Sequence, residues 1–306
     1  TGTNNTGVGV NSLQVNTTAS DNTAVGRNTL IANTTGATNT AVGSKALTAN
    51  TTASNNVAVG YLALATNTTG ASNIAVGRRA LNLNTTGTEN VALGTDAMYA
   101  TTTSSRNTAL GHAALDAQTD GSGYNTAVGN NALTANTSGT TNTAVGANAG
   151  DALTTGSNNT SLGYEADSTA VDASNEFTLG NASVSALRCA DTSIAALSDR
   201  RDKKDIIDSS YGLEFINKIR PVQFTWDRRN LVEGDLESIH NGKTRIGFIS
   251  QELQEAMKED SNEILDLVYE ANPERLEVKQ GKLIPVLTKA IQELSAKVEE
   301  LETKLN

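Results

Sequence analysis

The stretch NTAVGSKALTANTTASN, residues 39–55, is one copy of a motif that recurs from near the start of the chain to about position 184. The period is 17 residues, with one interval of 18. This period is too short for repeats built from pairs of helices, and it does not fit collagen or heptads. The sequence therefore predicts a solenoid with one coil per repeat. The glycine that closes the NTAVG segment recurs at positions 9, 26, 43, 60, 77, 94, 111, 129, 146, 163 and 180.

Each repeat offers a short strand directly before its glycine. The residue three before the glycine is mostly Thr, Val or Ile, the residue one before it is Val or Leu, and a small residue, usually Ala, stands between them. Because side chains alternate across a strand, the larger pair lies on one face and the small residue on the other. We expect the larger pair to point inward, together with a Leu or Met four residues after the glycine, in a core made mostly of Ala and Val.

An asparagine heads nearly every repeat, as in Asn22, Asn39 and Asn56. Asn and Gly both tolerate left-handed backbone conformations, so the pair suits a turn that recurs in every coil. The pattern predicts a parallel β-solenoid in which identical residues stack in ladders. The intervals between the repeating glycines, at the usual strand spacing, give a rod roughly 50 Å long. A core of such small residues favours lateral association of several chains.

Charge divides the chain into two parts. Positions 1–197 hold 17 charged side chains and positions 198–306 hold 39, and each part has a net charge of −5. Neither part offers a positive field for nucleic acid or an anionic membrane, and no apolar stretch approaches the ~20 residues needed to span a bilayer. We therefore expect no nucleic acid partner and no membrane insertion. The single Cys189 is expected to be a small packed residue without a chemical role.

The charged part predicts a small α+β unit that ends in a coiled coil. We expect a helix capped by Asp208, Ser209 or Ser210 and stopped by Pro221, strands over 222–226, 245–249 and 265–270, and a helix over 250–259. Residues 283–305 carry apolar side chains at alternating spacings of three and four, which is the seam of a coiled coil. A final helix that folds back on its own core is the alternative. The seam residues are Ile284, Leu287, Ile291, Leu294, Val298, Leu301 and Leu305.

The repeats resemble the head repeats of trimeric autotransporter adhesins, which form a left-handed β-roll of three chains. The resemblance covers residues 5 to about 184. The 17-residue period of this chain, longer than that of the adhesin heads, is similar to the version found in phage and other viral fibres. Ile or Val at the first seam position with Leu at the second favours two-stranded coiled coils. Because the resemblance implies threefold packing along a long rod, we expect a homotrimer.

The segment after the rod opens with Ser198, Asp199, Arg201 and Lys203 in the pattern Ser-Asp-x-Arg-x-Lys, and residues 247–252 later read Gly-Phe-Ile-x-Gln-Glu. With the terminal coiled coil after them, these motifs resemble the self-cleaving peptidase S74 family, the C-terminal intramolecular chaperone of viral tail spikes and fibres. The resemblance spans about residues 198–306. Asp202 departs from the family pattern, which often has an apolar residue there. The family's opening Ser-Asp-x-Arg-x-Lys and its later Gly-Phe-Ile-x-Gln-Glu are matched here by Ser198, Asp199, Arg201 and Lys203, and by Gly247, Phe248, Ile249, Gln251 and Glu252.

The resemblance implies one self-cleavage per chain at the bond between Leu197 and Ser198, with Ser198 as nucleophile and Lys203 as base. A lysine serves as a base only when its pKa lies well below ~10.4 through burial or cationic neighbours. A separation of five residues places two side chains on opposite faces of a strand and far apart on a helix. The two residues therefore meet only if 199–202 form a turn or if a second chain supplies one of them.

These expectations combine into a segment of a trimeric viral tail fibre or spike that is assembled in the host cytoplasm and carried on the virion. Residues 1–184 form the β-solenoid that attaches to a host receptor or glycan, beside other virion tail proteins. Residues 185–197 connect it to the chaperone at 198–306, whose coiled coil covers 283–305. We expect no cofactor, no metal and no activity on an external substrate.

Two other interpretations stay open. Threonine rows such as Thr34–Thr35 and Thr51–Thr52 suit a solenoid that binds ice or glycan and keeps a permanent C-terminal trimerisation domain, although the spacing of a flat ice-binding face is not systematic. A fragment of a bacterial trimeric autotransporter is the other interpretation. It is disfavoured because the chain ends in a segment that resembles a chaperone and not in a membrane anchor.

Overall fold

The computed structural model describes residues 2–119, 123–184, 187–188, 198–225, 244–258, 262–270 and 276–305, apart from the side chains of 262 and 263. The chain divides into two compact units, unit 1 at Thr1–Ala182 and unit 2 at Ser183–Asn306. Leu197 and Cys189 lie outside the described residues, as does most of the predicted connector at 185–197.

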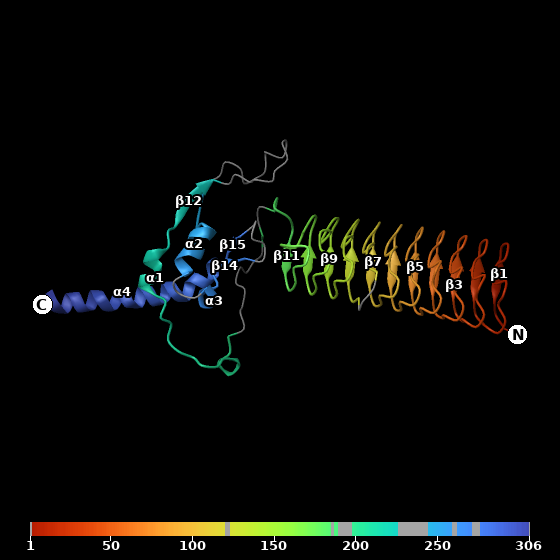
Figure 1. The fold of residues 1–306 in the computed structure, drawn as a ribbon, viewed down its shortest axis with the longest axis horizontal. Coiled ribbons are helices and arrows are strands. Elements are labelled where there is room, and N and C mark those ends of the chain that lie inside the picture. The colour runs from red at the N-terminus through yellow and green to blue at the C-terminus, as the bar shows by residue number, and fades with distance from the viewer. Residues whose placement is uncertain are drawn as a thin grey trace. The chain divides into compact units, whose positions relative to one another are not determined.

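Unit 1 is a parallel β-solenoid in which every coil contributes one three-residue strand to a single eleven-stranded sheet (Figure 1). Each strand residue pairs with the equivalent residue of the next repeat, as Thr40 does with Val57. The one repeat that is a residue longer, between Gly111 and Gly129, keeps this order because Thr108 pairs with Thr126. The predicted mostly-β solenoid is therefore confirmed. Its strands are β1 Thr6–Val8, β2 Thr23–Val25, β3 Thr40–Val42, β4 Val57–Val59, β5 Ile74–Val76, β6 Val91–Leu93, β7 Thr108–Leu110, β8 Thr126–Val128, β9 Thr143–Val145, β10 Thr160–Leu162 and β11 Phe177–Leu179.

The repeating glycine follows from how closely the coils stack. Gly60 has a φ of +134°, and a Cβ on it would lie only 2.4 Å from the carbonyl oxygen of Gly77 in the next coil. At the same place in each repeat, from Gly9 to Gly163, φ lies between 118° and 143°. Since a side chain at this position meets both a backbone strain and a clash, only glycine allows one coil to rest on the next.

The interior of the coil is filled by small residues and one large residue per repeat. In the third coil, Ala41 of the strand and Ala46 and Leu47 after it are fully buried. The leucine position adopts a left-handed conformation, with φ of 47° at Leu47 and 49° at Leu64. That conformation costs roughly 1–2 kcal/mol for an L-residue. Full burial of a leucine contributes about 1.5–3 kcal/mol, so burial offsets the strain.

The asparagine that heads each repeat forms a buried ladder from coil to coil. The Asn39 backbone N–H donates to Asn22 Oδ1 at 2.9 Å, and Asn39 Nδ2 donates to the carbonyl of Ala53 at 2.9 Å. The same bonds link Asn56 to Asn39 and to the carbonyl of Gly70. Each amide therefore satisfies backbone groups of its neighbours, which a buried polar group requires.

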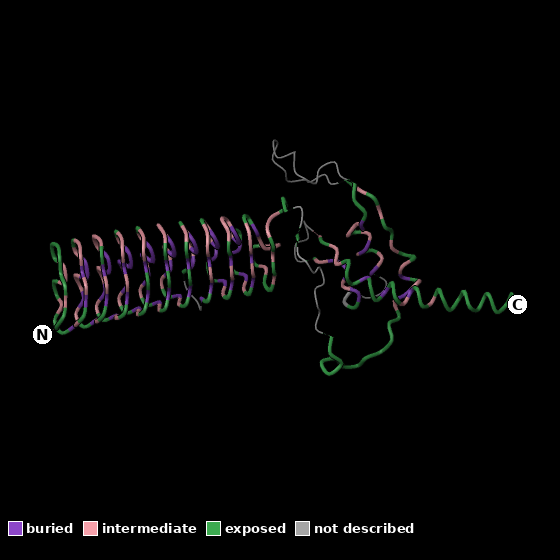
Figure 2. Tube along the Cα trace, turned by 180° about the vertical axis from the view of Figure 1, so that it is seen from behind, coloured by how far each residue is buried: buried purple, intermediate pink, exposed green. Residues whose placement is uncertain are grey.

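The larger pair of each strand points outward, so the prediction that it lies in the core was wrong. The first and third strand residues are partly or fully exposed, for example 41% at Ile74, 41% at Leu93 and 43% at Leu110. Buried and exposed stretches alternate around the inner coils (Figure 2). The Asn ladder and the leucine already fill the lumen, which leaves room only for the alanine of the strand. We call the first and third residues of β1–β11 the outer stripe; none of them is charged.

Unit 2 contains two small antiparallel sheets and four α-helices within its described residues. The paired strands are β12 with β13 and β14 with β15. The predicted strands over 222–226 and 245–249 and the predicted helix over 250–259 are confirmed with slightly different bounds, whereas only Val268–Tyr269 of the predicted strand over 265–270 is a strand. Its elements are the 3₁₀ helix η1 Arg200–Asp202, α1 Leu213–Lys218, β12 Val222–Thr225, β13 Thr244–Gly247, α2 Ser250–Met257, α3 Asn262–Leu265, β14 Val268–Tyr269, β15 Glu277–Val278, the 3₁₀ helix η2 Gln280–Lys282 and α4 Leu283–Leu305.

Helix α1 begins at a different cap from the one predicted. None of Asp208, Ser209 and Ser210 caps it; Gly212 is its N-cap residue and offers no side-chain bond. The carboxylate of Glu293 in α4 instead accepts from the Leu213 backbone N–H at 2.8 Å. A Cβ on Gly212 would lie 2.6 Å from that carboxylate, so the glycine makes room for the cap. Glutamate at a helix N-terminus also complements the helix dipole.

Helix α4 uses one face for its own unit and leaves another face open. Leu283, Val286 and Ala290 are buried, and the first two join the core of unit 2 around Phe215 and Leu253. The start of α4 therefore packs on the core of its own unit, as the alternative expected, but it does so through these buried residues and not through the seam. No helix in the described part of the chain is long and apolar enough to cross a membrane. All seven seam residues are exposed, from 43% at Leu287 to 86% at Leu305.

A close pair of acids stands near the C-terminal end of unit 1. Asp167 is half-buried, and burial together with the nearby Asp151 carboxylate raises the pKa of Asp167 to about 6. The unfolded chain loses this proton near pH 4, so the folded state is progressively destabilised as the pH rises from about 4 to about 6. The charged form of Asp167 therefore weakens the last coils at neutral pH.

Replacing Asn73 by Ala is expected to destabilise unit 1 by about 2–4 kcal/mol, because it leaves the Asn90 backbone N–H without its buried acceptor and removes one of the two amide donors to the Gly87 carbonyl. Thermal unfolding followed by circular dichroism measures the loss. The matched control is Thr86→Ala, which removes an exposed side chain and is expected to change stability by less than about 0.5 kcal/mol. Equal stability of the two variants would contradict the ladder's role.

The variant Asp167→Asn is expected to be more stable than the natural chain at pH 7 by about 1–2 kcal/mol, and equally stable at pH 4. Asparagine mimics the protonated acid, so only the neutral-pH penalty is removed. Melting curves at the two pH values provide the comparison, with the exposed Asp172→Asn as control. A gain of the same size at both pH values would show that charge is not the cause.

Candidate active site

Ser198 and Lys203 lie in contact at the start of the described stretch 198–225 of unit 2. Lys203 Nζ donates to Ser198 Oγ at 2.6 Å. The intervening residues make the turn that the sequence spacing requires, since η1 covers Arg200–Asp202 and the Lys203 N–H bonds the Arg200 carbonyl. A single chain thus brings together the two residues that the sequence proposed as nucleophile and base.

Asp199 and Arg201 fix this turn. Asp199 is the N-cap residue of η1, and its carboxylate accepts from the Arg201 backbone N–H at 2.8 Å. The Arg201 guanidinium also pairs with the same carboxylate, with Nη2 at 2.6 Å from Oδ2. The hydrogen bonds from the Arg201 side chain, and then from its backbone, lower the pKa of Asp199. These two predicted motif residues therefore hold the turn and do not touch the Ser198–Lys203 contact.

The whole segment is open to solvent in a single chain. Every residue from 198 to 210 is exposed. Lys203 acts as a donor to Ser198 in this contact, whereas a general base needs a free lone pair, which a lysine has only after the ammonium group loses a proton. A lysine loses that proton more easily when it is removed from water. The arrangement therefore has the right pair of groups but lacks the cover that would make the lysine a base.

The second motif lies at the junction of β13 and α2. Gly247 is buried where β13 pairs with β12, and a Cβ on it would lie 3.1 Å from the Phe224 ring. Phe248 packs against the core of unit 2. Glu252, in the first turn of α2, pairs with Arg220. Gln251 is exposed.

The two motifs are not joined by any hydrogen bond or ion pair among the described residues. The pair of Glu252 with Arg220 raises the pKa of Arg220 and ties α2 to the start of β12. Arg220 was missed in the sequence, where only its place directly before Pro221 marks it. The Gly247–Glu252 segment therefore supports the fold of unit 2.

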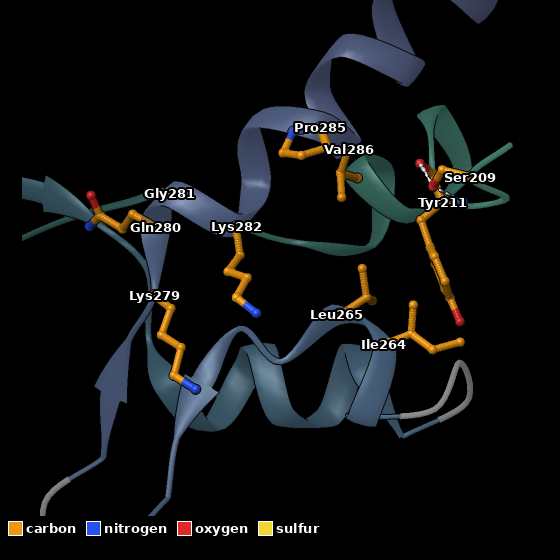
Figure 3. Close-up of a pocket in the computed structure, with 10 residues that line it drawn as sticks. All are labelled: Ser209, Tyr211, Ile264, Leu265, Lys279, Gln280, Gly281, Lys282, Pro285 and Val286. Carbon is orange, nitrogen blue, oxygen red and sulfur yellow. Dashed lines mark hydrogen bonds between the residues drawn. The ribbon is translucent and has the colours of Figure 1, made fainter. Parts of the chain in front are cut away.

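A pocket of about 530 Å³ lies elsewhere in unit 2, beside the start of α4 (Figure 3). Tyr211 and Ile264 stand at one end and Lys279 at the other. Lys279 and Lys282 both pair with Asp266, at 2.6 and 3.1 Å, and these bonds lower the pKa of Asp266. Neither Ser198 nor Lys203 lines this pocket, so it is separate from the candidate site.

The threonine rows of unit 1 are largely engaged in stacking the coils. Thr34 Oγ1 donates to the carbonyl of Thr51 at 3.0 Å, and Thr51 Oγ1 donates to that of Thr68 at 3.2 Å. The second threonine of each pair, such as Thr35, is exposed. The first row therefore has a structural role. No group of three His, Cys, Asp or Glu side chains within the described ranges is placed to hold a metal ion.

One family model matches the chain, over residues 198–261; it is Peptidase_S74, described as chaperone of endosialidase. No curated protein and no solved structure matches. The match begins at Ser198, the residue that Lys203 contacts, and it ends before α4. The segment 198–261 is thus similar to the peptidase S74 chaperones of endosialidase.

Proposed function

We propose that the chain is a segment of a trimeric, tail-fibre-like protein whose C-terminal unit assembles three copies and then detaches by cutting the bond between Leu197 and Ser198. The observation that carries the proposal is the 2.6 Å contact between Lys203 Nζ and Ser198 Oγ at the first residue of the S74 match. The released rod then serves for attachment to a host surface, carried on the virion.

Two exposed apolar surfaces support assembly from copies of this chain. The seam of α4 is open along its length and has the spacing of a coiled coil. The outer stripe runs along all eleven strands without a charge, and its apolar side chains include Val42, Ile74 and Leu93. Extended apolar surfaces of this kind mark interaction sites. Three copies that pack seam to seam and stripe to stripe cover both surfaces.

Assembly also supplies what the candidate active site lacks. A neighbouring copy that covers residues 198–203 removes Lys203 from water and favours its neutral form. Cleavage then depends on assembly, which makes release of the C-terminal unit follow formation of the rod.

The chemistry is an N-to-O acyl shift followed by hydrolysis. Neutral Lys203 takes the proton of Ser198 Oγ, and the oxygen attacks the carbonyl carbon of Leu197. The bond from that carbon to the Ser198 nitrogen breaks, and the nitrogen receives the proton from Lys203. Water then hydrolyses the ester, leaving a carboxylate at Leu197 and a free amine and hydroxyl at Ser198. No cofactor is required, and each chain reacts once.

The variants Ser198→Ala and Lys203→Ala are each expected to abolish cleavage, because one lacks the nucleophile and the other the base. Intact mass spectrometry of the purified protein is expected to find the fragments 1–197 and 198–306 in the natural chain and in neither of these two variants. The matched controls are Ser209→Ala and Lys204→Ala, which alter nearby exposed residues of the same types and are expected to cleave normally. A single uncut species in an assembled natural chain contradicts self-cleavage.

The variant Ile291→Glu is expected to reduce the assembly to single chains and to slow cleavage at least tenfold, because three carboxylates would meet in an apolar seam. Light scattering measures the mass of the assembly, and gel electrophoresis follows cleavage. The control Ala296→Glu places the same charge on the exposed side of α4 away from the seam. A three-chain assembly that survives Ile291→Glu would exclude the seam as the contact between copies.

A further inference from the structure

The outer stripe alone does not define how copies align along the rod. Equivalent residues of consecutive repeats lie side by side, and the commonest stripe residues are Thr at the first position and Val at the third, as in Thr23 and Val25. A copy that slips by one coil therefore meets almost the same surface. Register is weakly specified wherever a pattern repeats in this way.

Between β2 and β9, the stripe departs from this pattern in one block of adjacent strands. At the first position, Val57, Ile74 and Val91 of β4–β6 replace threonine, and at the third, Leu93 and Leu110 of β6 and β7 replace valine. Their side chains make no contribution to the coil interior, which is filled by alanine, leucine and asparagine. The solenoid itself thus gives no reason for the larger residues at these five positions, which we call the central block.

We propose that the central block sets the axial register between copies of the chain. This inference rests on the proposed association through the outer stripe. In register, the larger residues of all copies lie at the same levels. After a slip of one coil, the level of Ile74 meets a smaller valine and the level of Leu110 meets either Leu93 or Val128. Apolar contacts with missing or excess methyl groups are less stable than matched ones.

The central block also explains how the copies stay aligned once unit 2 has been released. The proposed cleavage between Leu197 and Ser198 separates the rod from the coiled coil. After this cleavage, only contacts within the rod keep its copies in axial register. A register pattern within the stripe therefore keeps the assembled rod aligned after release.

Cross-linking of full-length chains tests the proposal. In a Cys189→Ala background, one tagged chain carries Thr143→Cys in β9, and a second tagged chain carries either Thr143→Cys or Thr126→Cys in β8. Both positions lie outside the central block. Mild oxidation of co-expressed chains joins only cysteines whose Cα atoms lie within about 7 Å. The 143–143 pair reports aligned copies, and the 126–143 pair reports a slip of one coil.

A chain with a displaced block provides the decisive comparison. Its block is moved one coil toward the N-terminus by Thr40→Val, Val57→Ile, Ile74→Val, Val76→Leu, Val91→Thr and Leu110→Val. These six changes conserve the composition of the stripe, so overall apolar burial stays constant. Paired with the natural block, the displaced chain is expected to slide one coil, which brings its cysteine at position 126 beside the cysteine at position 143 of the other chain.

The expected result is that the ratio of 126–143 to 143–143 cross-links rises by roughly tenfold when the displaced chain replaces the natural one. An unchanged ratio in assembled chains overturns the proposal, because the axial register between copies is then set by something other than the central block. Failure of the proposed function gives a different result, because natural chains that do not associate through the outer stripe stay single or form neither disulfide. As a matched control, six exchanges that swap Thr and Ser at exposed positions such as Thr35 are expected to leave the ratio unchanged.

Discussion

A buried amide in each coil holds the rod together. Because an asparagine such as Asn39 or Asn56 bonds the coil before it and the coil after it, no coil satisfies its polar groups alone. A single turn of this solenoid therefore has little stability, and the array is stable only as a stack. The same amides and one leucine per repeat take up the lumen, so the strand can place no more than an alanine inside.

This narrow interior has consequences for the rest of the molecule. The larger strand residues are displaced to the outside, where they form the outer stripe without a charge. A stripe of this length without a charge, apolar at its third position, is typical of a contact surface, and α4 presents an apolar surface suited to copies of the same chain. In the proposed function, assembly in turn supplies the cover that the Ser198–Lys203 contact lacks. The proposed coiled coil and the proposed self-cleavage therefore follow from the same physical constraint as the solenoid.

Local pattern was sufficient to predict much of this structure. The spacing of Gly43 and Gly60 predicts the length of one coil, and the alternating spacing of three and four predicts the seam of α4. The short spacing of Ser198 and Lys203 requires a turn if the two side chains are to meet. Alternation along a three-residue strand separates two faces but does not say which is inside, because that depends on what else fills the lumen. The helix cap made by Glu293 and the ion pair made by Arg220 join residues distant in the chain, so no local pattern predicts either contact.

Native mass spectrometry of the full-length Ser198→Ala chain tests the central claim most directly, because it weighs the intact assembly before any release. The account predicts a dominant species of three chains, each of 31.8 kDa, that persists on dilution. A dominant single chain at all concentrations would leave the outer stripe and the seam uncovered, and would contradict the account.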